Sequence, residues 1–300
     1  MANLYTHQDE NVRKTWLLMT AVVALLVGLG WVFSQAYGDT SFLYVFATVS
    51  VGGNIFAYWF SDKIALAVSG ARAVTREENI RLYRIVENLC ITAGLPLPKL
   101  HILPGMQINA FATGRNAQHA AVAVTEGALE RLDDNELAGV LAHELSHVGN
   151  RDILISTIVV VLAGVISALS NIFLRVSSFG GGRRDNNREG GGALFVVAII
   201  SAILAPIAAT LIQLSVSRKR EYLADASGAL LTRYPEGLAS ALEKIASDGA
   251  SLPRATSGTA HLYLSNPFRG RDAASWFTRL FQTHPPIEER IRILRGMEEK

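Results

Sequence analysis

The chain has 300 residues, which is enough for one or two domains. Half of the residues are hydrophobic and the mean hydropathy is positive, as in few soluble proteins, so we expect membrane-spanning segments. The formal net charge of +2 is too small to indicate nucleic-acid binding. The only cysteine, Cys90, excludes an intrachain disulfide and a cysteine-cluster metal site, and its place in an expected amphipathic helix favours a core role.

Two uncharged segments, residues 16–34 and 41–60, follow a polar stretch at 1–15. Each segment is long enough to cross a bilayer, and the short turn at 38–40 predicts a transmembrane helical hairpin. A cleaved signal peptide is the alternative, because residues 34–36 resemble a small-residue cleavage site. The length of the first segment and the second one directly after it favour the hairpin.

Residues 61–152 are charged and rich in turns, as expected for a water-exposed domain. Residues 75–78, Thr-Arg-Glu-Glu, are typical of a capping box, and they predict the start of an amphipathic helix that Gly94 ends. Three short strands should follow, at residues 99–103, 109–113 and 120–125.

The next helix is predicted to start at a second box, formed by Asp133 and Glu136, and to end at Gly149. This helix carries the sequence His-Glu-Leu-Ser-His at residues 143–147. Because H-E-x-x-H seldom arises by chance, we treat this stretch as the centre of the protein's chemistry.

His143 and His147 are four residues apart, so on a helix they share one face and can chelate one Zn²⁺ per chain. Glu144 is then placed to act as the general base that takes a proton from water at the metal. A surface helix with two solvated histidines is the alternative, but Glu144 falls on an apolar stripe, where a carboxylate without a partner would be costly. We therefore favour a catalytic zinc site.

Residues 153–174 and 193–217 form a second pair of uncharged segments, separated by a loop at 175–192 that is rich in glycine and arginine. The rest of the chain, 218–300, has soluble character again, with a final helix expected at 287–295. The expected fold is therefore a mainly α membrane protein. It combines four apolar helices with a zincin-like α+β catalytic domain that is built around a small sheet.

A catalytic zinc usually has three protein ligands. Glu221 and Asp225 lie one helical turn apart, so one could bind zinc while the other holds a ligand imidazole. A juxtamembrane helix with ordinary charges is the alternative. Residues 143–147 precede the third apolar segment and Glu221 follows the fourth, so two crossings return the chain to the same side of the membrane.

Basic residues suggest which side this is. Arg13 and Lys14 precede the first span and residues 218–220 are all basic, so the positive-inside rule places the catalytic domain in the cytoplasm. The arginines in the 175–192 loop would then lie on the opposite side. A second topology therefore stays open, in which residues 153–217 form a hairpin that does not fully cross.

The chain resembles the HtpX family of membrane zinc metallopeptidases, relatives of the eukaryotic prenyl-protein (CAAX) protease. The resemblance covers nearly the whole chain and includes the paired apolar segments, H-E-x-x-H, and the motif S-R-x-x-E-x-x-A-D at residues 217–225. It implies that Glu221 is the third zinc ligand. It also implies that residues 109–114 form an edge strand that binds extended substrate. The residues expected to bind substrate are Asn109, Ala110, Phe111 and Ala112.

The resemblance further implies a metalloendopeptidase of the bacterial inner or archaeal cytoplasmic membrane that cleaves misfolded or damaged membrane proteins under stress. His284 and Tyr222 are candidate oxyanion donors, although a turn histidine and a packed tyrosine are the simpler interpretations. A site-specific prenyl-protein protease and a non-catalytic scaffold with a structural zinc remain as alternatives. The apolar segments contain no ionisable residue, which argues against a transporter.

Overall fold

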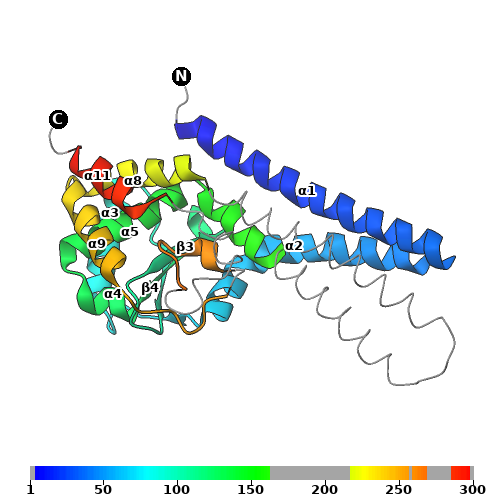
Figure 1. Cartoon of the computed structure of the whole chain (residues 1–300), viewed down its shortest axis with the longest axis horizontal. Coiled ribbons are helices and arrows are strands. Elements are labelled where there is room, and N and C mark those ends of the chain that lie inside the picture. Colours follow the sequence, from blue (N-terminus) through cyan, green and yellow to red (C-terminus); the bar gives the residue numbers. More distant parts are fainter. Residues whose placement is uncertain (1–3, 163–216, 257–258, 269–284, 298–300) are drawn as a thin grey trace.

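A computed structural model of the chain describes residues 4–162, 217–256, 259–268 and 285–297. Two long helices, α1 (Leu4–Tyr37) and α2 (Ser41–Ser69), form a hairpin that extends away from the other elements (Figure 1). The chain reverses at Gly38, whose φ of 67° is in the left-handed region that glycine adopts without strain. Both helices have the length and apolar composition of candidate membrane spans, as the sequence predicts. Large apolar side chains lie exposed along the hairpin: Trp31, Tyr44, Ile55 and Phe56.

Four strands form a small mixed sheet in the order β1-β2-β4-β3. Strands β2 and β4 are parallel, whereas β1 pairs with β2, and β3 with β4, in the antiparallel sense. The three predicted strands are present, and β3 is an edge strand of the described sheet. The strand bounds are β1 (Arg72–Ala73), β2 (Lys99–Leu103), β3 (Ala110–Gly114) and β4 (Ala120–Thr125).

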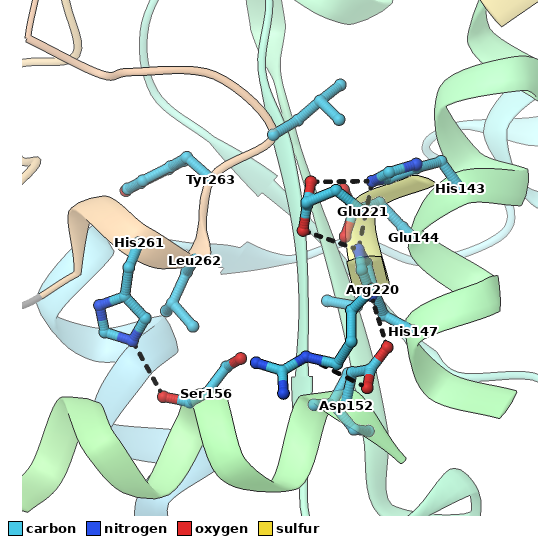
Figure 2. A pocket seen from close by; sticks show the side chains of 13 residues that line it. His143, Glu144, His147, Asp152, Ser156, Arg220, Glu221, His261, Leu262 and Tyr263 are labelled. Carbon is cyan, nitrogen blue, oxygen red and sulfur yellow. Dashed lines mark hydrogen bonds and ion pairs between the residues drawn. The ribbon is translucent and has the colours of Figure 1, made fainter. Parts of the chain in front are cut away.

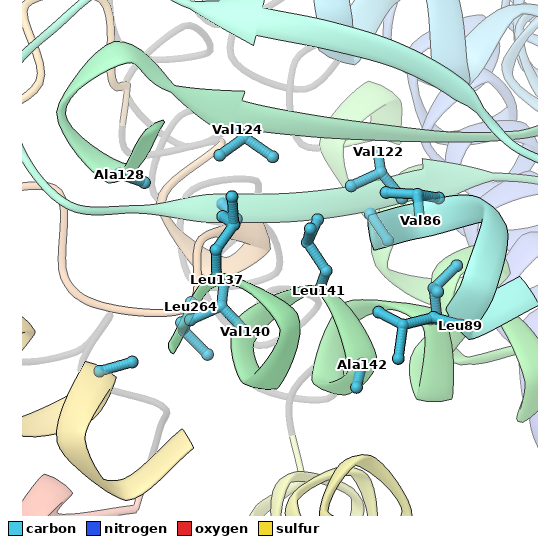
Figure 3. Close-up of a cluster of buried hydrophobic side chains, with 14 of the residues drawn as sticks. Val86, Leu89, Val122, Val124, Ala128, Leu137, Val140, Leu141, Ala142 and Leu264 are labelled. Atoms are coloured by element: carbon cyan, nitrogen blue, oxygen red, sulfur yellow. The ribbon is translucent and has the colours of Figure 1, made fainter. Parts of the chain in front are cut away.

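Helix α5 (Asp134–Gly149) carries the H-E-x-x-H sequence and is buried along most of its length. Leu137 and Leu141 point from α5 toward Val122 and Val124 of β4 (Figure 3), and all four belong to one buried cluster. Each fully buried leucine contributes about 1.5–3 kcal/mol relative to an exposed one, so this face fixes α5 on the sheet.

Other helices complete the domain around α5. Helices α3, α8 and α9 all pack on α5, and α11 packs on α9 and α8. The bounds are α3 (Ile80–Ala93), α4 (Glu126–Arg131), α8 (Arg218–Thr232), α9 (Pro235–Ser247) and α11 (Ile287–Arg295), with 3-10 turns η1 (Ala117–His119) and η2 (Ala260–Leu262).

The two predicted capping boxes have different outcomes. Asp133 and Glu136 form the full reciprocal box at the start of α5. Helix α3, in contrast, begins after Asn79, whose side chain accepts a hydrogen bond from the backbone N–H of Leu82 at 2.9 Å. Glu78 still accepts from the N–H of Thr75 at 3.0 Å, but within a turn. Asparagine is among the strongest N-caps, and it displaces the predicted start by one helical turn.

A second helix follows α5 directly, from Asp152 to Leu162, at an angle of 84°. Arg151 makes the corner with a φ of 58°. Residues 163–216 lie outside the described part of the chain, so the predicted loop at 175–192 and most of the second apolar pair do too. The described residues contain two candidate spans, or three if α5 and its continuation are one bent span.

Candidate metal centre

Two histidines and a glutamate meet in the interior of the domain that is built around α5. The Nε2 atoms of His143 and His147 on α5 lie 3.2 Å apart. The carboxylate oxygens of Glu221 on α8 lie 3.8 Å from Nε2 of His143 and 3.7 Å from Nε2 of His147 (Figure 2). One ligand atom from each of the three residues lies within 4.8 Å of the others, so a single ion could contact all three.

A glycine allows α8 to approach this close to α5. A Cβ atom on Gly228 would lie 3.0 Å from the backbone nitrogen of His143, so a larger residue would force the two helices apart. Glu221 lies in the first turn of the same helix and is buried. The carboxylate therefore enters the interior beside the two imidazoles, instead of facing water at the end of a span.

The second ring nitrogen of His143 faces a buried carboxylate. Nδ1 of His143 lies 2.9 Å from Oδ1 of Asp225. Arg290 of α11 grips the same carboxylate with two hydrogen bonds, from Nε at 2.8 Å and from a terminal guanidinium nitrogen at 2.7 Å. Burial alone would raise the pKa of Asp225, but the charge of Arg290 and its hydrogen bonds outweigh this effect and lower the pKa to about 2. Asp225 is therefore ionised and can accept the Nδ1 proton.

His147 has an equivalent partner. Its Nδ1 lies 3.0 Å from Oδ2 of Asp152, the first residue after the corner at Arg151. Burial lowers the pKa of His147, but the hydrogen bond to Asp152 and the nearby carboxylates raise it to about 9. When the imidazoles are neutral, a carboxylate on Nδ1 holds the proton on that atom, so each ring directs the lone pair of Nε2 into the space that it shares with Glu221. This donor set fits a divalent zinc ion.

Glu144 lies next to this cluster and is almost fully buried. Burial raises the pKa of its carboxyl group, whereas the neighbouring His143 and His147 and a hydrogen bond from the backbone N–H of Ala112 act in the opposite direction. The net direction is upward. A carboxylate with a raised pKa is better suited to hold a proton than one in water.

The remaining wall of the pocket comes from residues that were not predicted to belong to the site. Arg220 directly precedes Glu221, and the segment from η2 to Leu264 contributes His261 and Tyr263 (Figure 2). A lone histidine in a polar stretch gives no spacing signal, so His261 could not be found from the sequence. Of the two predicted oxyanion candidates, His284 lies outside the described residues, and Tyr222 does not line the pocket.

The expected substrate strand is present, but its four residues differ in accessibility. Asn109 is buried, and its amide donates hydrogen bonds to the carbonyl oxygen of Ser265 at 3.0 Å and to its hydroxyl at 3.2 Å. The carbonyl oxygen of Ala110 accepts from the N–H of Leu264 at 3.0 Å. Phe111 is fully buried against the ring of Tyr263. Among these four, Ala112 alone lines the pocket.

Comparison with known proteins agrees with this geometry. Residues 76–298 match the profile of Peptidase family M48. The chain belongs to peptidase family M48. A protein named Protease HtpX homolog from Pyrococcus furiosus is 49% identical over 284 residues, which cover 94% of each chain. Another of that name, from Tropheryma whipplei (strain Twist), is 46% identical over 295 residues, 98% of each chain.

These relatives confirm the predicted resemblance to the HtpX metallopeptidases, and with it the assignment of this M48 chain as a membrane-associated metallopeptidase. The crystal structure of S. mikatae Ste24p aligns with 97% of this chain and 67% of its own, at 19% identity and a TM-score of 0.49.

Proposed function

We propose that this M48 protein is a membrane-embedded zinc metalloendopeptidase in which His143, His147 and Glu221 hold one Zn²⁺. One observation carries the proposal: donor atoms from two helices far apart in the chain converge within 4.8 Å, in the buried interior of the domain. Two neutral imidazoles and one carboxylate, with a fourth position open to substrate, are a usual ligand set of catalytic zinc.

The chain's own residues supply the rest of the chemistry. When bound, zinc would polarise the scissile carbonyl and acidify the attacking water. Glu144 would accept the proton of that water and deliver it to the nitrogen of the leaving amine. The backbone N–H of Ala112 aims the Glu144 carboxylate, while Asp225 and Asp152 keep the imidazoles in one tautomer and orientation. Arg220 and His261 are the candidates for stabilising the oxyanion, since both line the pocket.

Substrate would bind as an extended segment beside Ala112. Because Leu264 already covers the outer edge of β3 at Ala110, only a short stretch of the edge can pair with a substrate backbone. Such binding depends on an exposed, extended backbone more than on sequence. This favours unfolded or damaged membrane proteins as substrates. The site also lies close to the hairpin, because Asn11 of α1 is hydrogen-bonded to Asp152 beside His147, and this position suits chain that emerges from the bilayer.

The proposed orientation places the catalytic domain in the cytoplasm of a bacterium or archaeon. Both hairpin helices carry basic residues at the end nearest the domain, including Arg13, Lys14 and Lys63, whereas the turn at the far end carries Asp39. Basic residues favour the cytoplasmic side of a membrane.

An assay of the full chain in detergent or nanodiscs tests the function. Unfolded casein is the substrate, and zinc content is measured in the same samples. We expect cleavage by the zinc-loaded protein, loss of cleavage after chelation, and recovery when one equivalent of zinc returns. Cleavage that persists in protein shown to be free of metal would refute a zinc peptidase.

A further inference from the structure

The N-terminal helix α1 reaches the surroundings of the metal centre through Asn11. This residue is buried, and its side-chain nitrogen donates hydrogen bonds to Oδ1 of Asp152 at 2.6 Å and to the carbonyl oxygen of Asn150 at 3.1 Å. The partners are 141 and 139 residues away in the sequence, so the contact exists only when the hairpin and the catalytic domain are assembled.

The carboxylate of Asp152 connects Asn11 to His147. Its other oxygen, Oδ2, is the one that faces Nδ1 of His147 at 3.0 Å. Oδ1 also lies 3.5 Å from Nε of Arg220. The carboxylate is thus held on one oxygen by the N-terminal helix and by α8, and it holds the metal-facing imidazole with the other.

The backbone around Asp152 explains why this support matters. Asp152 comes directly after Arg151, a non-glycine residue with a φ of 58°, at the 84° corner between α5 and the next helix. Within a continuous helix, the backbone would fix the direction of the Asp152 side chain. The backbone at the Arg151 corner has a sparsely populated conformation, so it constrains that direction less. Asn11 pins both flanks of the corner, since it binds Asn150 on one side and Asp152 on the other.

The two histidines are therefore supported by different parts of the molecule. His143 is held by Asp225 and Arg290, which both belong to the catalytic domain. His147 is held by Asp152, whose support includes a residue of a candidate membrane span. Arg290 donates two hydrogen bonds to Asp225, at 2.8 and 2.7 Å, whereas the guanidinium of Arg220 lies 3.5 Å from Asp152, so the Asn11 amide carries a larger share of the support on the His147 side.

We propose that Asn11 is a positioning residue of the metal centre: by fixing Asp152 it orients His147, so that α1 is part of the zinc site as well as a membrane anchor. The inference rests on the proposed zinc site. It follows that a displacement of α1 from the domain lowers zinc affinity, without any change in the three ligands themselves.

The test measures zinc affinity of the full-length protein in nanodiscs, by competition with a chelator, together with the absorption spectrum of the Co²⁺-substituted protein. Asn11→Leu keeps the volume and removes the donor; Asn11→Gln keeps the amide. Thr15→Val is the matched control, because Thr15 is also buried, one turn further along α1, and its hydroxyl donates to the backbone carbonyl of Asn11. Asp152→Ala removes the link itself.

We expect Asp152→Ala to weaken zinc binding by about 10- to 100-fold, the usual effect of losing a partner of a ligand histidine. Asn11→Leu should weaken it several-fold and shift the Co²⁺ spectrum, Asn11→Gln should lie closer to the native protein, and Thr15→Val should leave both unchanged. In the Asp152→Ala background, Asn11→Leu should have no further effect.

Three results would overturn the inference: native zinc affinity in Asn11→Leu, an equal loss in Thr15→Val, or a full additional loss in the double variant. If Asn11→Leu does not fold, Asn11→Ser takes its place under the same criteria. A native protein that binds no zinc at all would instead refute the proposed function, so the two failures are distinguishable.

Discussion

The backbone N–H of Ala112 in the edge strand β3 faces the carboxylate of Glu144 in α5 and lowers the pKa of that group. This contact joins the strand that is expected to receive substrate to the residue that is expected to move the proton. Because Ala112 directs its N–H away from β4 and into the pocket, a substrate strand and Glu144 meet at the same backbone group.

The first prediction concerns this group. Ala112→Pro removes the N–H while leaving the ladder to β4 in place, since this donor points outward. We expect strongly reduced casein cleavage with unchanged zinc content. Ala112→Gly, which keeps the N–H, should remain active. Loss of metal or of the folded domain in the proline variant would instead mark the strand as purely structural.

Replacing Glu144 by Gln should abolish cleavage and leave zinc bound. The amide retains the volume but cannot accept a proton, and general-base catalysis typically contributes about 10²–10⁴-fold in rate. Cleavage and metal content are measured on the same samples, with Glu130→Gln, a substitution in α4, as the control. Near-native cleavage by Glu144→Gln would exclude Glu144 as the base.

Replacing Glu221 by Ala should lower zinc affinity and activity together, because it removes one of the three converging ligand atoms. Glu236→Ala on α9, whose partners are Arg295 and Ser240, should affect neither. Chelator competition measures the affinity. A Glu221→Ala protein that keeps a full equivalent of tightly bound zinc would require a different third ligand.

Zinc binding should release a proton near pH 7. The pKa of His147 is raised to about 9 in the metal-free protein, so its imidazole is protonated at neutral pH, whereas a zinc ligand must be neutral. Affinity should therefore fall by about tenfold for each pH unit below about 9. Calorimetry in buffers of different ionisation enthalpy counts the protons, and Asp152→Asn should reduce the count. Proton-independent binding would contradict the assignment.

The same pKa shift predicts how the metal-free protein responds to pH. A folded-state pKa above the ordinary value of about 6.5 means that protonation of His147 stabilises the fold below that pH. This contribution should disappear as the pH rises toward about 9, and thermal unfolding of the metal-free protein would detect the loss.

Membrane orientation can be tested with single cysteines and an impermeant thiol reagent in intact cells. Asp39→Cys, at the exposed turn of the hairpin, should be labelled, whereas Asn88→Cys, exposed on α3, should react only after lysis. The native Cys90 is buried and its pKa is raised to about 11, which makes it a poor nucleophile, and Cys90→Ser removes it altogether. Labelling of Asn88→Cys before lysis would place the domain outside.

Features with local causes could be predicted from the sequence. The box of Asp133 and Glu136, the end of α3 at Gly94 and the spacing of His143 and His147 each depend on residues within one or two turns. The start of α3 was displaced for an equally local reason: Asn79 competes with Thr75 as a cap, and a pattern search does not rank the two.

The support around the candidate site could not be predicted in the same way. Asp152 and Arg290 look like ordinary charges in the sequence, and their partners become known only when the corner at Arg151 and the packing of α11 are known. Asn109 illustrates the opposite case. The motif that contains it was recognised, but the fold uses its amide to tie down Ser265 and leaves Ala112 to face the pocket.

The parts of the metal centre are distributed along the chain in a way that governs when it can form. His143 is synthesised well before Glu221, and Arg290, which neutralises Asp225, comes almost at the end. A ribosome-bound chain therefore lacks the third candidate ligand until α8 has emerged, and it lacks the partner of Asp225 until α11 has emerged and folded back. The candidate metal centre should therefore assemble late in synthesis, after both halves of the domain have been made.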